Sequence, residues 1–245
     1  MNRFNLPDHL AERTIPMGAA RERARGEFVL YWAHHALRAD ENPALDTAAA
    51  IAHNLKLPLL VYQGLGGRHR YNSDRSHSFI LESARDFAGQ LERGGQRVLF
   101  HLPADPAQPG PLSALLARSA VAVSELFPAP PFPGWYQRHL QADTDLLLLL
   151  VDSSCTLPMT IESRLYTRAF QFRNAWMAEL RQRARAPWPT AGDWPPACDG
   201  DPGFEPFDLE RSALPGAIAG CRVDHSRPPV AATPGGSAAG HARWD

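Results

Sequence analysis

Short apolar runs alternate with stretches of helical periodicity between residues 28 and 185. Five runs rich in β-branched, aromatic and aliphatic residues predict buried strands at 28–32, 59–62, 97–102, 120–123 and 145–151. Apolar residues recur at helical spacing in the stretches that follow them, at about 43–55, 74–93, 111–118, 135–141 and 161–185. This alternation predicts an α/β fold: a doubly wound five-stranded parallel sheet, Rossmann-like, with right-handed crossovers.

The first strand-and-helix unit carries the clearest local signals. Its strand runs into a polar stretch, 34–41, and then into Asn42-Pro43. Asn is a favoured N-cap because its side-chain oxygen accepts a free backbone N–H, and Pro at the first helical position loses no hydrogen bond. The stretch 34–41 follows the carboxyl end of a strand, which is where open α/β sheets bind ligands.

The two ends of the chain lack this repeat. Residues 1–25 are polar and arginine-rich, and we interpret them as an N-terminal extension with a short helix near 19–25. Residues 26–185 form the predicted α/β domain. Residues 186–245 are rich in Pro, Gly and Trp without sustained periodicity, which predicts an irregular C-terminal linker.

Composition narrows the class of protein. The formal net charge is -1, so no global positive field favours nucleic acid. Three cysteines are too few and too scattered for a disulfide framework or a zinc site, and no metal site is predicted. No apolar run approaches the roughly 20 residues that span a bilayer. These features predict a soluble cytoplasmic protein that makes no membrane contact.

Several familiar nucleotide-binding and catalytic motifs are missing. The turn after the first strand reads AHHALRADEN, without G-x-G-x-x-G, and G-x-x-x-x-G-K-[ST] occurs nowhere. His34-His35 does not have the H-x-G-H spacing of adenylyl-transfer enzymes. Ser153 and Ser154 lack the G-x-S-x-G context of a hydrolase. The sequence therefore gives no catalytic residue.

Other polar residues of the turn have both structural and functional interpretations. His34 and His35 are adjacent, so only one of them can point into a crevice, where it could act in catalysis. We favour the structural interpretation, in which one histidine packs and the other is solvated. Arg38 with Asp40 or Glu41 could shape the turn or present a guanidinium fork to a ligand.

The aromatic residues Tyr166, Phe170, Phe172 and Trp176 fall largely at helical spacing, and we expect them in the core.

The opening unit resembles the DNA photolyase and cryptochrome family, in its class II branch. The matching residues are Tyr31-Trp32, Arg38 and Asn42-Pro43-Ala44-Leu45, with Glu41 where Asp is usual. Phe79-Ile80-Leu81-Glu82 resembles the family's F-x-L-E-G helix, and Asp105-Pro106 its G-D-P turn. The segment 152–159 departs from the family pattern D-x-H-N-x-V-P-x-W, keeping only Asp152 and Pro158.

This resemblance implies the N-terminal α/β domain of a light-dependent DNA repair protein. In the family, a pyrimidine dimer is flipped out of the duplex and receives an electron from photoexcited flavin. FAD and damaged DNA bind in a helical domain that follows the α/β domain. We expect that domain to be absent from this chain, which would then not repair DNA alone.

The chemistry that the resemblance leaves to the α/β domain is antenna binding, with a deazaflavin or folate chromophore. By topology, we expect Trp32, His34, Arg38, Glu125 and Phe127 to line the crevice at the carboxyl ends of the first and fourth strands. Two alternatives remain. The chain could be a non-enzymatic, cryptochrome-like module that docks a flavin-binding helical domain in trans through 186–215, or a gene fragment without function.

Overall fold

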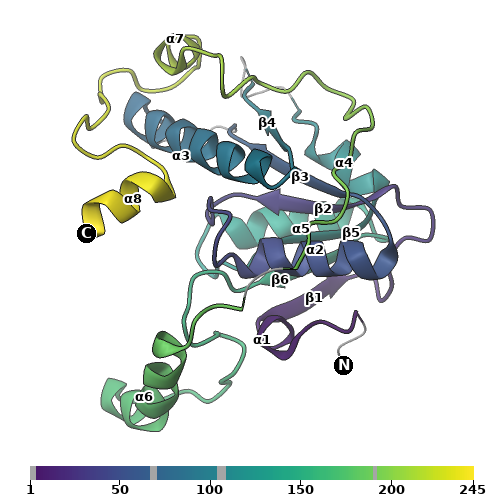
Figure 1. The fold of residues 1–245 in the computed structure, drawn as a ribbon, viewed down its shortest axis with the longest axis vertical. Coiled ribbons are helices and arrows are strands. Elements are labelled where there is room, and N and C mark those ends of the chain that lie inside the picture. The colour runs from purple at the N-terminus through teal and green to yellow at the C-terminus, as the bar shows by residue number, and fades with distance from the viewer. Residues whose placement is uncertain (1–3, 67–70, 104–108, 190–191) are drawn as a thin grey trace.

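A six-stranded sheet forms the centre of the computed structural model, which describes residues 4–66, 71–103, 109–189 and 192–245 (Figure 1). The strands are β1 (Thr14–Gly18), β2 (Phe28–Ala33), β3 (Leu59–Gly64), β4 (Val98–His101), β5 (Ser119–Glu125) and β6 (Leu147–Val151). Their spatial order is β1-β6-β5-β2-β3-β4. The five strands from β2 to β6 pair in parallel, which confirms the doubly wound α/β prediction.

The predicted count of five strands is wrong by one, because the stretch predicted as an extension contributes β1. This strand pairs antiparallel with β6, Thr14 opposite Val151 and Gly18 opposite Leu147. All five residues of β6 are buried. The backbone N–H and C=O groups of a buried strand need hydrogen-bond partners along both edges, and β1 supplies the second edge. The short helix expected near 19–25 does not form.

Helices cover both faces of the sheet. The first five are α1 (Asp8–Ala11), α2 (Pro43–Leu55), α3 (Asp74–Arg93), α4 (Leu112–Arg118) and α5 (Phe132–Ala142). On one face, alternate strand residues such as Val29 and Tyr31 pack in a core with side chains of α1, α2 and α3. On the other, Leu30 and Trp32 pack with side chains of α4 and α5. Two-sided burial explains why the strands are apolar runs rather than alternating patterns.

The helix starts follow the capping residues in the sequence. Asn42 caps α2, its Oδ1 accepting the Leu45 N–H at 3.1 Å, as predicted. Ser73 caps α3 in a capping box, in which its hydroxyl accepts from the Ser76 N–H and the Ser76 hydroxyl accepts from the Ser73 N–H. The turn at Asp105-Pro106 lies outside the described residues.

Helix α6 (Ala169–Arg185) is shorter than predicted and has no buried residue. It projects away from the sheet in Figure 1. Phe170 is 52% and Phe172 44% exposed, so the prediction that these aromatic residues lie in the core is wrong. Tyr166 and Trp176 instead share a small polar cluster in which both donate hydrogen bonds to the Glu162 carboxylate.

The C-terminal segment is largely irregular, as predicted, and it wraps around the domain. Trp188 Nε1 donates to Asp46 Oδ2 at 2.8 Å on α2. The Leu59 N–H donates to the Pro196 carbonyl, and the Cys198 N–H donates to the Leu59 carbonyl. Further along, α7 (Leu214–Ala219) and α8 (Ser237–Trp244) both contact α3. Among the described residues, none of the helices combines the length and apolar character needed to cross a bilayer.

Candidate functional site

The sheet order reverses between β2 and β5. From β2 the chain first adds β3 and β4 on one side and then crosses over to β5 and β6 on the other. Loops leaving the carboxyl ends of two such strands diverge, and open α/β sheets bind ligands between them. We refer to the region between the loops after β2 and β5 as the crevice. Residues 34–41 follow β2, and 126–131 follow β5. Three of the expected lining residues, Trp32, His34 and Glu125, lie at this point.

Glu125 is the centre of a polar cluster in the crevice, although it is fully buried. The Tyr31 hydroxyl donates to its Oε1 at 2.6 Å. The backbone N–H of His34 donates to its Oε2 at 3.0 Å. Asn42, the cap of α2, donates through Nδ2 to the Tyr31 hydroxyl at 3.2 Å. The carboxylate is therefore oriented by the strand and by the helix start that follows it.

Both histidines of the turn point toward Glu125, so the expectation that one would be solvated is wrong. His34 Nδ1 lies 3.0 Å and His35 Nδ1 3.8 Å from Glu125 Oε2, and the two Nδ1 atoms are 2.9 Å apart. Their side chains are only 7% and 22% exposed. Strand alternation ends with β2 at Ala33, so it does not separate the next two side chains. These three side chains form a donor set that could hold a metal cation.

The outer nitrogens of the two rings also have partners. The Tyr136 hydroxyl of α5 lies 2.9 Å from His34 Nε2. The Ser154 hydroxyl, just after β6, lies 3.1 Å from His35 Nε2. Each imidazole is thus held at its far side, with Nδ1 directed inward.

Burial sets the protonation of this cluster. Desolvation lowers the pKa of His34 to about 3 and lowers the pKa of His35. It also raises the pKa of Glu125, against the hydrogen bonds and the histidine beside it. Desolvation and the adjacent Glu125 carboxylate raise the pKa of Tyr31 far above its ordinary value. At neutral pH both rings are uncharged and offer nitrogen lone pairs.

Aromatic rings extend the crevice from the histidines toward solvent. His34 stacks on Phe132 with ring centroids 4.8 Å apart, and His35 meets Phe127 edge-on at 5.1 Å. Phe127 and Phe132 contact each other at 5.0 Å. Both phenylalanines are half-buried. Trp32 is buried beneath His34, with centroids 5.9 Å apart.

Arg38 shapes the turn. Its guanidinium donates to the Glu41 carbonyl at 2.8 Å and to the Ser153 carbonyl at 3.0 Å. It thereby ties the loop after β2 to the loop after β6. Asp152 fixes that second loop, accepting the Ser154 and Cys155 N–H groups on one oxygen and the Met159 N–H on the other.

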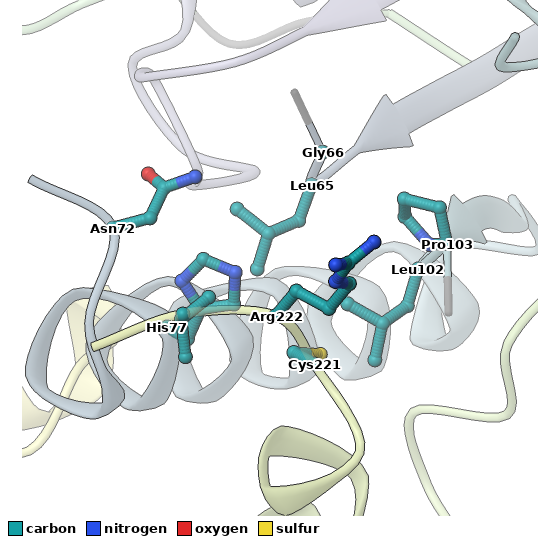
Figure 2. Close-up of a pocket in the computed structure, with 9 residues that line it drawn as sticks. Leu65, Gly66, Asn72, His77, Leu102, Pro103, Cys221 and Arg222 are labelled. Carbon is teal, nitrogen blue, oxygen red and sulfur yellow. The ribbon is translucent and has the colours of Figure 1, made fainter. Parts of the chain in front are cut away.

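A separate small hollow lies at the carboxyl ends of β3 and β4. Leu65 and Leu102 line it, and His77 of α3 and Arg222 of the C-terminal segment face it (Figure 2). His77 is 4% exposed, and its Nδ1 is buried without a hydrogen-bond partner. None of the five residues expected to bind a cofactor lies in this hollow.

Comparison with known proteins points to one kind of protein. No family model matches the chain. Over 90 residues it is 36% identical to the deoxyribodipyrimidine photo-lyase of Methanothermobacter thermautotrophicus. This matched segment makes up 36% of this chain and 20% of the relative. The chain thus spans about a fifth of the length of this curated relative.

Two solved structures share the fold. A class III photolyase from Agrobacterium tumefaciens superposes with a TM-score of 0.51 at 17% identity, covering 80% of this chain and 40% of that one. An archaeal photolyase from Sulfolobus tokodaii superposes with a TM-score of 0.51 at 10% identity, covering 80% of this chain and 42% of that one. The closer similarity to the class II branch stays a prediction. The chain therefore resembles photolyases, in sequence over 90 residues and in fold over most of its length.

Proposed function

We propose that this photolyase-like domain binds a light-harvesting chromophore in the crevice between the loops after β2 and β5. The observation that carries the proposal is the half-buried aromatic pair Phe127 and Phe132, set over the histidines where the sheet order reverses. Planar ring systems gain from offset or edge contacts with such rings. The Sulfolobus tokodaii structure is described as holding two FAD molecules and implying a novel light-harvesting cofactor, which makes FAD a third candidate beside deazaflavin and folate.

In this proposal the chain's own residues bind and orient the chromophore. Phe127 and Phe132 contact its ring faces, and Trp32 supports His34 from below. Arg38 fixes the loop after β2 by tying it to the loop after β6. When bound, such a chromophore would supply light absorption and energy transfer to a flavin, which a helical domain would hold. Damaged DNA would be contacted only through that helical domain.

Chromophore retention tests this directly. Purified protein is mixed with deazaflavin, folate or FAD and passed through gel filtration, and we expect one of them to co-elute with a shifted absorption band. Phe127→Ala should weaken binding about tenfold, because a lost aromatic contact costs roughly 0.5–1.5 kcal/mol beyond buried area. Phe172→Ala on α6 is the matched control and should bind normally. If the protein retains none of the three pigments, the proposal is refuted.

Docking of a flavin-binding helical domain is a second candidate function, supported by a different surface from the one expected. Much of 186–215 already packs on the domain through Trp188, Trp194 and Phe207. Helix α6 instead exposes Phe170 and Phe172. Aromatic residues are enriched at interfaces. Arg173→Cys, on α6, should cross-link to a photolyase helical domain supplied in trans. Gly134→Cys, on α5, is the control and should not cross-link. Cross-linking from the α5 position but not from the α6 position would refute docking at α6.

A further inference from the structure

Three ligand atoms converge on one point in the crevice, two from adjacent histidines and one from a glutamate 91 residues away. They are Nδ1 of His34, Nδ1 of His35 and Oε2 of Glu125, separated by 2.9, 3.0 and 3.8 Å. We infer that these three side chains bind a divalent first-row transition-metal cation. The inference goes beyond chromophore binding and does not rest on it.

The separations fit a single bound ion. Bonds from nitrogen or carboxylate oxygen to such a metal are about 2.0–2.2 Å long. Two ligands on one ion are then about 3.0 Å apart at a right angle and about 3.4 Å apart at a tetrahedral angle. The observed distances bracket these values, so small side-chain rotations are sufficient to place all three atoms on the ion.

A proton satisfies these contacts less well than a cation does. A neutral imidazole Nδ1 carries either one hydrogen or one in-plane lone pair. His34 Nδ1 faces both His35 Nδ1, at 2.9 Å, and Glu125 Oε2, at 3.0 Å. One hydrogen or lone pair can serve both contacts only if they share it in a three-centre hydrogen bond. A cation accepts the lone pairs of all three atoms together.

Charge balance also favours a cation. Glu125 is fully buried, and its ion-pair partners among the described residues are the two histidines. A buried carboxylate is costly without a compensating positive charge. Two neutral imidazoles and one carboxylate carry a net charge of about -1, which a divalent ion more than offsets. Two imidazole nitrogens favour zinc, cobalt, nickel or iron over magnesium or calcium.

The outer contacts have the arrangement that metal-binding histidines need. Ligating histidines almost always use the second ring nitrogen to hold a fixed partner, which sets the tautomer and the ring orientation. Here Tyr136 and Ser154 hold the two Nε2 atoms, and Tyr31 holds the second carboxylate oxygen. His35 is 22% exposed, which gives an ion a path from solvent.

Metal titration of the full chain, without chromophore, tests the inference. Protein stripped with a chelator and dialysed is titrated with Co²⁺, followed by its visible absorption, and then with Zn²⁺ in competition. We expect one Co²⁺ per chain, displaced by Zn²⁺. His35→Ala and Glu125→Gln should weaken binding by more than about 100-fold, because losing a ligand exceeds the 10–100-fold cost of losing an outer contact.

Two further variants refine the test. Ser154→Ala removes only an outer contact and should weaken binding roughly tenfold. His241→Ala, on the exposed face of α8, should bind as the native chain does. Far-UV circular dichroism checks folding, and His35→Ala carries the test if Glu125→Gln does not fold. No Co²⁺ binding by the native chain, or undiminished affinity in His35→Ala, would overturn the inference.

Discussion

Asp46 is a buried carboxyl group whose ionisation opposes folding, and Asp46→Asn measures that effect. The side chain lies in the first turns of α2, 9% exposed, and accepts a hydrogen bond from Trp188 Nε1. Burial raises its pKa from 3.8 to about 6, against the Trp188 hydrogen bond, which lowers it. An asparagine at this position keeps the shape and the acceptor oxygen but never becomes charged.

The sign follows from proton linkage. The native state holds the Asp46 proton more tightly than the unfolded chain does, so the carboxyl group favours folding as the pH falls. Below pH 3.8 both states are protonated, and above about pH 6 both are ionised. Between these values the native chain loses stability as the pH rises. The gap of about two pKa units corresponds to about 3 kcal/mol, as an upper value.

Urea unfolding at pH 4.5, 5.5, 6.5 and 7.5 gives the required free energies. We expect the stability of Asp46→Asn relative to the native chain to rise with pH, by up to about 2 kcal/mol across this range, because part of the total change falls below pH 4.5. Asp145→Asn, where the side chain is 83% exposed, is the control and should show no comparable trend. A pH-independent difference, or one that falls with pH, would refute the electrostatic account of this site.

Two further substitutions test the packing and the polar cluster. Gly26→Ala would place a Cβ 2.2 Å from the Ala120 Cα, so we expect chemical unfolding to show a loss of about 1–3 kcal/mol in stability. The control is Gly134→Ala on α5, where the new Cβ meets nothing within 4 Å and the change should be neutral or stabilising. Equal effects of the two substitutions would contradict the close approach at Gly26. Tyr31→Phe removes the buried hydroxyl that donates to Glu125, and we expect it to lower the free energy of unfolding by about 1.5–3 kcal/mol in the same assay. A change below about 0.5 kcal/mol would show that this hydrogen bond does not hold the carboxylate.

The parallel part of the fold could be predicted because two-sided burial leaves a clear trace in the sequence. All six residues of β2 and all seven of β5 are buried. β2 is a continuous apolar run, and the centre of β5 is the apolar run 120–123. The antiparallel strand β1 leaves no such trace. It lies at the sheet edge, half-exposed, and contains Pro16, which an edge strand tolerates because one side of its backbone needs no ladder hydrogen bond.

The site was predictable only in part, because strand order places some of its residues and loop conformation places the others. Topology alone placed His34 and Glu125 together, because the carboxyl ends of β2 and β5 are neighbours. His35, Tyr31 and Ser154 join them through ring orientation and loop conformation, which strand periodicity does not encode. Ser154 is 119 residues away from its partner His35, so local pattern gives no signal for the contact.

The exposed aromatic residues of α6 show the limit of periodicity in the other direction. Phe170 and Phe172 occur in a helix-length segment, and that pattern is the same for a helix buried in its own domain and for one that presents a surface. Only the position of the helix relative to the sheet separates the two cases (Figure 1).

The structure of the chain with its retained chromophore tests the central claim most directly. The account predicts ring density in contact with Phe127 and Phe132, beside His34, in the crevice between the loops after β2 and β5. Density in the hollow lined by Leu65 and His77, or at the exposed face of α6 with an empty crevice, would contradict it.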